Sequence, residues 1–213
     1  GLAVLVCVSA VALCQTPLFN LLGFEFAFAI GIPLSLFAGF CGIGRVQSSA
    51  ETSWRAWWHC LLRVLTLSVI PLLLISLNAL RVQNCNYLEG LAHFLIITLT
   101  GAAVASAWGV VVADLLPRYS NWCFFGLWCL SIARCFFQFW FHPQIDLFNP
   151  FLGYFPGALY DEVLLIDERL LASRAEDLAW AMFGLTLTAW RKSDWLRSRR
   201  WVTAILVTTL AGL

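Results

Sequence analysis

The sequence predicts an all-α fold, namely a polytopic transmembrane helical bundle of about six spans with the last span incomplete. Apolar residues make up 61% of the 213 residues and charged residues only 12%, against roughly 45–50% and about 25% in a soluble domain. Several apolar stretches reach the roughly 20 residues that a helix needs to cross a bilayer. Abundant apolar material also excludes a disordered chain.

Four stretches have the length and composition of spans: Leu21–Gly44, Cys60–Leu80, Leu91–Leu116 and Trp122–Phe141. An earlier apolar stretch, Gly1–Cys14, is short, and a signal peptide is the alternative interpretation of it. No basic residue precedes its apolar run and no good cleavage site follows, which favours a membrane segment.

Three further segments complete the expected chain. Val163–Asp177 mixes Leu with charged residues, which is typical of an amphipathic interfacial helix. Leu178–Trp190 reaches spanning length if its helix begins near Ser173. Trp201–Leu213 is apolar up to its last residue, so we expect residues 1–213 to be a single transmembrane domain and a fragment of a longer chain.

The basic residues predict the orientation of the bundle. The loop after Leu178–Trp190 carries the densest cluster of Lys and Arg, which places this loop on the cytoplasmic side. Alternation of the spans then places the N-terminus inside, and the loop of residues 142–177 outside. The cluster consists of Arg191, Lys192, Arg197, Arg199 and Arg200.

Small residues and overall charge bear on the expected partners. Gly101, Ala105 and Gly109 recur every four residues, so two helices can approach closely there, either within the bundle or from a second subunit. We expect the lipid bilayer as the main partner, with a protein subunit at this face or at the outer loop as a further option. A net charge of +1 gives no reason to expect nucleic acid, and no motif indicates a cofactor.

Charged residues within spans are costly and therefore mark candidate functional sites. Glu25 and Arg134 fall at similar depth near the outer ends of their spans, so they are able to pair. An ion pair that joins two helices is one interpretation, and a polar transport path is the other. Asp114 lies near the inner interface, where its carboxylate reaches water.

A metal site is a further hypothesis. Glu89 and His93 are four residues apart and share a helix face, and His142 lies at the end of another span on the same side. His and carboxylate ligands suit zinc. The chain has no H-E-x-x-H motif and no C-x-x-C pair, so three separate segments would have to converge.

The outer loop has the most distinctive composition in the chain. The segment 142–162 is too apolar for an ordinary solvated loop and too rich in Pro and Gly for a helix. Pro156 and Gly157 suit a type II turn. The loop either carries function or closes the outer mouth of the bundle. Its candidate residues are Asn149, Tyr154, Pro156, Gly157, Tyr160, Asp161 and Glu162.

The segment Phe148–Glu162, with the sequence FNPFLGYFPGALYDE, resembles part of the multi-span region of large bacterial membrane proteins of myxobacterial type. In that family, a soluble domain similar to a peptidase of the gluzincin (peptidase-MA-like) kind sometimes follows the spans. The resemblance covers about fifteen residues and the multi-span layout. It implies a bacterial inner-membrane location and a soluble domain after the last span, but it assigns no catalytic residue here.

Three functions remain. A membrane anchor or assembly module for a soluble domain or partner subunit, without chemistry of its own, leads because polar residues within the spans are so few. A transporter or channel element would use Glu25 and Arg134. A membrane metalloenzyme would use the His and carboxylate residues of the outer face.

Overall fold

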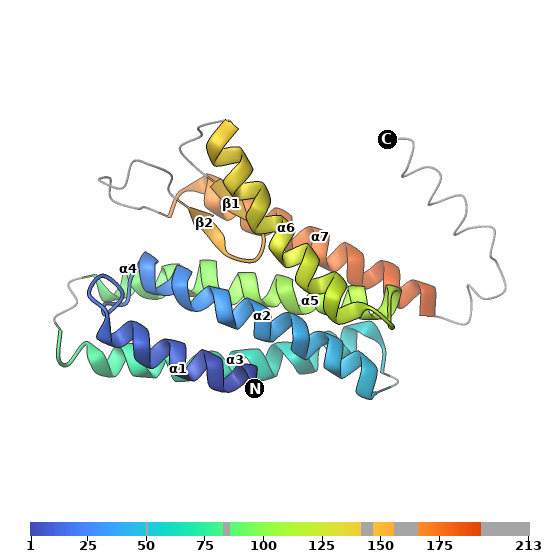
Figure 1. Ribbon diagram of the computed structural model, residues 1–213, viewed down its shortest axis with the longest axis horizontal. Coiled ribbons are helices and arrows are strands. Elements are labelled where there is room, and N and C mark those ends of the chain that lie inside the picture. Colours follow the sequence, from blue (N-terminus) through green and yellow to red (C-terminus); the bar gives the residue numbers. More distant parts are fainter. Residues whose placement is uncertain (50, 83–85, 142–146, 156–165, 193–213) are drawn as a thin grey trace.

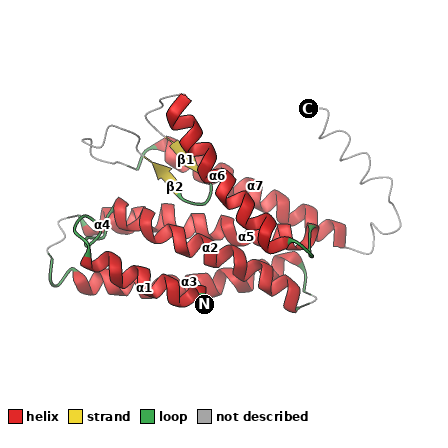
Figure 2. Cartoon of the chain, viewed as in Figure 1, coloured by secondary structure: helices red, strands yellow, loops and turns green. Residues whose placement is uncertain are grey.

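The computed structural model describes residues 1–49, 51–82, 86–141, 147–155 and 166–192, and helices dominate it (Figures 1 and 2). The helices run nearly side by side, except for α6, which diverges from the others towards its C-terminal end (Figure 1). Their bounds are α1 Leu2–Gln15, α2 Phe24–Ser48, α3 Ser53–Asn78, α4 Tyr87–His93, the π-helix η1 Phe94–Leu99, α5 Thr100–Leu115, α6 Ser120–Phe141 and α7 Glu168–Lys192.

Four helical segments are long and apolar enough to cross a membrane, and they correspond to the four long stretches expected from the sequence: Phe24–Ser48, Ser53–Asn78, Tyr87–Leu115 and Ser120–Phe141. The mostly helical fold is therefore confirmed. α1 is shorter, with 14 residues, and α7 is not among the four. Trp201–Leu213 lies outside the described residues.

α2 and α5 form the centre of the bundle because small residues let their backbones touch. A Cβ atom built on Gly109 would lie 2.1 Å from the carbonyl oxygen of Gly39, and one on Gly42 would lie 2.5 Å from that of Ser106. Gly101, Ala105 and Gly109 are all buried within the chain. The expected small-residue face thus packs inside the bundle, against α2 and Phe151.

The third long apolar stretch contains a turn of π-helix that the hydrophobic pattern does not reveal. η1 joins α4 to α5 without a break, so one continuous helix covers Tyr87–Leu115. Thr98 in η1 donates a hydrogen bond of 2.7 Å to the carbonyl oxygen of Ala27 in α2, which anchors the wider turn. π-helical turns occur often beside functional sites, and Ile97 of this one lies against Gly153.

The segment expected to form the outer loop contains a short antiparallel β-hairpin, which is the one departure from the all-α prediction among the described residues. β1 spans Leu147–Asn149 and β2 spans Gly153–Phe155, with Phe148 opposite Tyr154. The chain turns between Asn149 and Gly153. Gly153 has a φ of +96°, a conformation that residues with a Cβ atom rarely adopt.

α7 joins the two segments expected after the hairpin. The sequence predicts an interfacial helix over Val163–Asp177 and a span over Leu178–Trp190 whose helix begins near Ser173, and one continuous helix, Glu168–Lys192, covers most of both. The Asp167 carboxylate accepts a hydrogen bond of 2.8 Å from the backbone N–H of Leu170 and so caps the helix start. Residues 156–165 lie outside the described chain.

The bundle has two ends, the hairpin end and the Asp114 end. The hairpin end contains the hairpin, the start of α2 and the start of α7, and the Asp114 end contains the end of α5 and the end of α7 (Figure 1).

Candidate functional site

The hairpin is the part of the expected outer-loop site that the structure describes. Asn149 and Tyr154 belong to it. The other five candidates, Pro156, Gly157, Tyr160, Asp161 and Glu162, lie outside the described residues.

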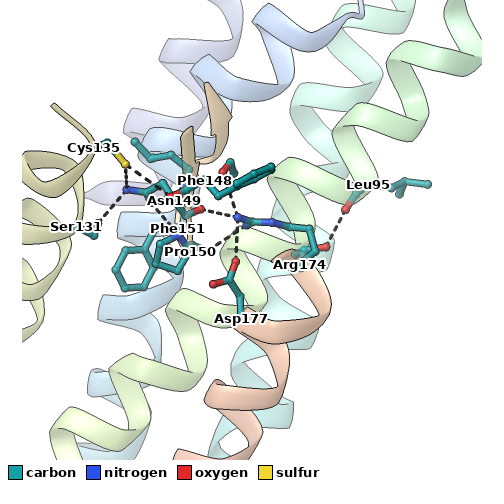
Figure 3. A network of polar contacts seen from close by, with 12 residues as sticks. Leu95, Ser131, Cys135, Phe148, Asn149, Pro150, Phe151, Arg174 and Asp177 are labelled. Atoms are coloured by element: carbon teal, nitrogen blue, oxygen red, sulfur yellow. Dashed lines mark hydrogen bonds and ion pairs between the residues drawn. The ribbon is translucent and has the colours of Figure 1, made fainter. Parts of the chain in front are cut away.

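Asn149 shapes the turn between the two strands. Its side-chain carbonyl oxygen accepts hydrogen bonds from the backbone N–H groups of Phe151, at 2.9 Å, and Leu152, at 3.0 Å. Its side-chain amide donates to the Ser131 hydroxyl at 3.3 Å and to the Cys135 sulfur at 3.5 Å, both on α6 (Figure 3). The 5%-exposed Asn149 therefore fixes the turn and attaches it to α6.

Arg174 holds the same turn from the side of α7. Its guanidinium group donates to the carbonyl oxygens of Asn149 at 2.6 Å, Gly153 at 3.1 Å and Pro150 at 3.3 Å (Figure 3). One of its nitrogens also lies 2.9 Å from a carboxylate oxygen of Asp177. Arg presents several donors in a fixed plane, so one side chain can bind three carbonyl groups together.

Burial makes these contacts energetically important. The Arg174 side chain is 4% exposed and that of Asp177 is 19% exposed. Both residues lie in the N-terminal half of α7, and burial removes their charged groups from most of the surrounding water. A buried guanidinium remains charged, so the hairpin folds around a fixed positive charge.

Apolar packing locks the hairpin against the helices. Phe151 is 2% exposed, and its ring lies edge-to-face with that of Phe124 at 6.1 Å between centroids. Two glycines permit the close contact: a Cβ atom on Gly101 would lie 2.3 Å from the Phe151 carbonyl oxygen, and one on Gly153 would lie 2.5 Å from the side chain of Ile97 in η1. The hairpin is thus part of the packed core and not a solvated loop.

His93, one of the expected metal ligands, lies near this hairpin. His93 is buried, and a nitrogen of its ring lies 2.9 Å from the carbonyl oxygen of Glu89. Its ring also packs edge-to-face on Phe24, which in turn contacts Tyr154. Within the described ranges, no three His, Cys, Asp or Glu side chains are grouped to hold a metal ion. His142 lies outside those ranges, so the site of Glu89, His93 and His142 stays a prediction.

Asp114 occupies the opposite end of the bundle and is more buried than the sequence suggests. Its side chain is 3% exposed and forms an ion pair with Lys192 of α7. It also accepts a hydrogen bond of 2.5 Å from the hydroxyl of Ser53 at the start of α3. Asp114 therefore joins α3, α5 and α7, whereas we expected its carboxylate to reach water.

Glu25 and Arg134, the two remaining charged candidates, do not pair with each other. Glu25 is half-buried in the first turn of α2. Arg134 is exposed on α6, and no ion pair joins it to Glu25 or to any other residue in the described part of the chain.

The sequence reasoning missed Arg174 and Asp177 as the centre of the site. Their spacing of three residues on a helix was a signal, because such a pair lies on one helix face. The carbonyl groups that complete the arrangement come from a turn more than twenty residues earlier, which no local pattern reveals.

The chain matches no protein family, no curated protein and no solved structure.

Proposed function

We propose that this chain is an integral membrane anchor or assembly module, which holds a soluble domain or a partner subunit at the membrane without chemistry of its own. One observation supports this proposal above the others: the buried charged side chains bind other groups of the same chain. Arg174 and Asp177 hold the hairpin, and Asp114 joins three helices. Charges engaged in this way stabilise a rigid scaffold and do not line a path for solutes.

The proposed location is a bacterial inner membrane, with about six spans, the N-terminus inside and the hairpin end outside. The distribution of basic residues supports this orientation, because the Asp114 end collects most of them. These include Arg45 at the end of α2, Arg55 at the start of α3, Arg118 before α6, and Arg191 and Lys192 at the end of α7.

Reporter fusion and cysteine labelling test the proposal. A fluorescent protein fused after Leu213 should remain with membranes through alkaline carbonate extraction, whereas the unfused reporter stays in solution. In a cysteine-free background, an impermeant maleimide should label Leu80→Cys, at the hairpin end, in intact cells and should label Ser48→Cys only after permeabilisation. Release by carbonate would contradict the anchor, and the reverse labelling pattern would contradict the orientation.

Transport is the alternative that uses Glu25 and Arg134. Proteoliposomes that contain the chain should show no ion flux above that of protein-free vesicles. A flux that Glu25→Gln or Arg134→Gln abolishes would favour a transporter or channel element and would overturn the proposed function.

A further inference from the structure

A groove lies between α6 and the pair of α5 and α7, with the hairpin at one end. It has a volume of about 300 Å³. Large apolar side chains make up most of its wall, among them Trp108, Leu127, Leu130 and Trp180. Trp180 is 57% exposed and Leu130 is 66% exposed, so the groove opens sideways at the face that α6 presents outward.

The charges around this groove do not balance. Asp177 and Arg134 both contribute to its wall. Asp177 is neutralised by Arg174 at 2.9 Å, while Arg134 has no ion pair within the described residues. Among the described residues, the groove therefore carries one positive charge without a counter-charge in an apolar setting, where such a charge is costly unless an anion binds it.

The order of residues along α6 gives the groove a polarity. Leu127, Ser131 and Arg134 are spaced by four and three residues, so they share one face of the helix. Arg134 is the nearest of them to the hairpin end, and Leu127 lies in the other half of the helix, towards the Asp114 end. A charged head beside Arg134 and a hydrocarbon chain beside Leu127 would fit this order, with the head towards the membrane surface.

We propose that the groove binds one anionic phospholipid, with its phosphate on the Arg134 guanidinium and one acyl chain along Leu127 and Leu130. Guanidinium groups bind phosphate oxygens through paired, charge-assisted hydrogen bonds. A net charge of −1 on the lipid matches the single positive charge of the groove. A zwitterionic lipid fits less well, because its own cation competes for the phosphate.

Photo-crosslinking of lipid to the purified full chain tests this proposal. The chain is reconstituted in vesicles of unlabelled phosphatidylcholine that contain a small share of one photoreactive lipid. This probe carries a diazirine in one acyl chain and is either a phosphatidylglycerol or a phosphatidylcholine. After irradiation, mass spectrometry locates the labelled residues. Labelling of Leu127, Leu130 and Trp180 should be several-fold higher with the phosphatidylglycerol probe, whereas exposed Leu73 on α3 should react equally with both probes.

Substitution of Arg134 isolates the headgroup contact. Arg134→Gln should reduce phosphatidylglycerol labelling in the groove at least roughly tenfold, the effect of losing the charge-assisted hydrogen bonds to the phosphate. The matched control is Arg118→Gln, which removes an exposed Arg at the other end of α6 and should leave the labelling unchanged. Because Arg134 is exposed, thermal unfolding of both variants should match that of the parent protein.

Three outcomes would overturn the proposal. Equal labelling of the groove by the two probes would show contact with bulk lipid only. Phosphatidylglycerol labelling that is unchanged in Arg134→Gln would show that the charge of Arg134 does not select the lipid headgroup. Absence of groove labelling, together with crosslinks between α6 helices of two copies, would assign the groove to a second copy of the chain.

Discussion

Charged side chains attach α7 to the rest of the bundle near both of its ends. Arg174 binds the hairpin at one end, Lys192 pairs with Asp114 at the other, and water reaches the two contacts to different extents. At the hairpin end, the side chains of Arg174 and Asp177 are 4% and 19% exposed. At the Asp114 end, Asp114 is 3% exposed but Lys192 is 42% exposed. Loss of one member of a buried ion pair lowers the free energy of unfolding strongly, because the other charge is left buried without a partner. An ion pair with one hydrated member contributes little to that free energy. The contacts of Arg174 therefore determine the conformation of the hairpin, and those of Asp114 chiefly hold helices together.

The largest expected effect comes from removal of the buried cation. Arg174→Met keeps most of the side-chain volume but leaves Asp177 unpaired and removes the guanidinium donors from three carbonyl groups. We expect the free energy of unfolding to fall by about 3–5 kcal/mol, as for a broken buried ion pair. Unfolding in SDS from mixed micelles, followed by circular dichroism, measures this loss. The hairpin should also detach, so that Phe151→Cys reacts with maleimide in the Arg174→Met background.

Neutralisation of adjacent carboxylates provides the matched control for this prediction. Asp177→Asn should destabilise the protein, because Arg174 then lacks its counter-ion. Glu176→Gln alters an exposed side chain and should change the unfolding free energy by no more than about 0.5 kcal/mol. Equal effects of the two substitutions would show that the Arg174 pair is hydrated, and the contrast between the two ends of α7 would disappear.

A packing test separates the apolar from the electrostatic attachment of the hairpin. Gly101→Ala places a methyl group against the Phe151 carbonyl oxygen, so we expect a loss of about 1–3 kcal/mol from overpacking. Gly126→Ala is the matched control, since a Cβ atom there meets no atom within 4 Å. It should be neutral or stabilise the helix by up to about 1 kcal/mol. The same SDS unfolding measurement compares both variants, and a tolerated Gly101→Ala would show that the hairpin does not press on α5.

The sequence predicts most of the helices and little of the site, for a physical reason. Apolar runs of spanning length depend on local composition, so the segments around α2, α3, α5 and α6 are predictable. Asn149-Pro150 and Gly153 mark turns, but strands of three residues carry too little periodicity to be recognised. From the sequence alone, Arg174 fits the solvated polar face of an amphipathic helix as well as it fits a buried role. Its true role depends on carbonyl groups that only the folded hairpin brings to it.

The smallest expected effect lies at the Asp114 end. Lys192→Met removes the ion pair with Asp114 but leaves the hydrogen bond from Ser53. Because Lys192 is partly hydrated, the free energy of unfolding should fall by about 1 kcal/mol or less. Added salt should shrink the difference from the parent protein, since ions screen a hydrated pair and leave a buried one largely unaffected. Lys192→Arg, which keeps the charge, is the control and should unfold like the parent protein. If Lys192→Met costs as much as Arg174→Met and is insensitive to salt, both ends of α7 are equally desolvated and the hairpin end has no special role.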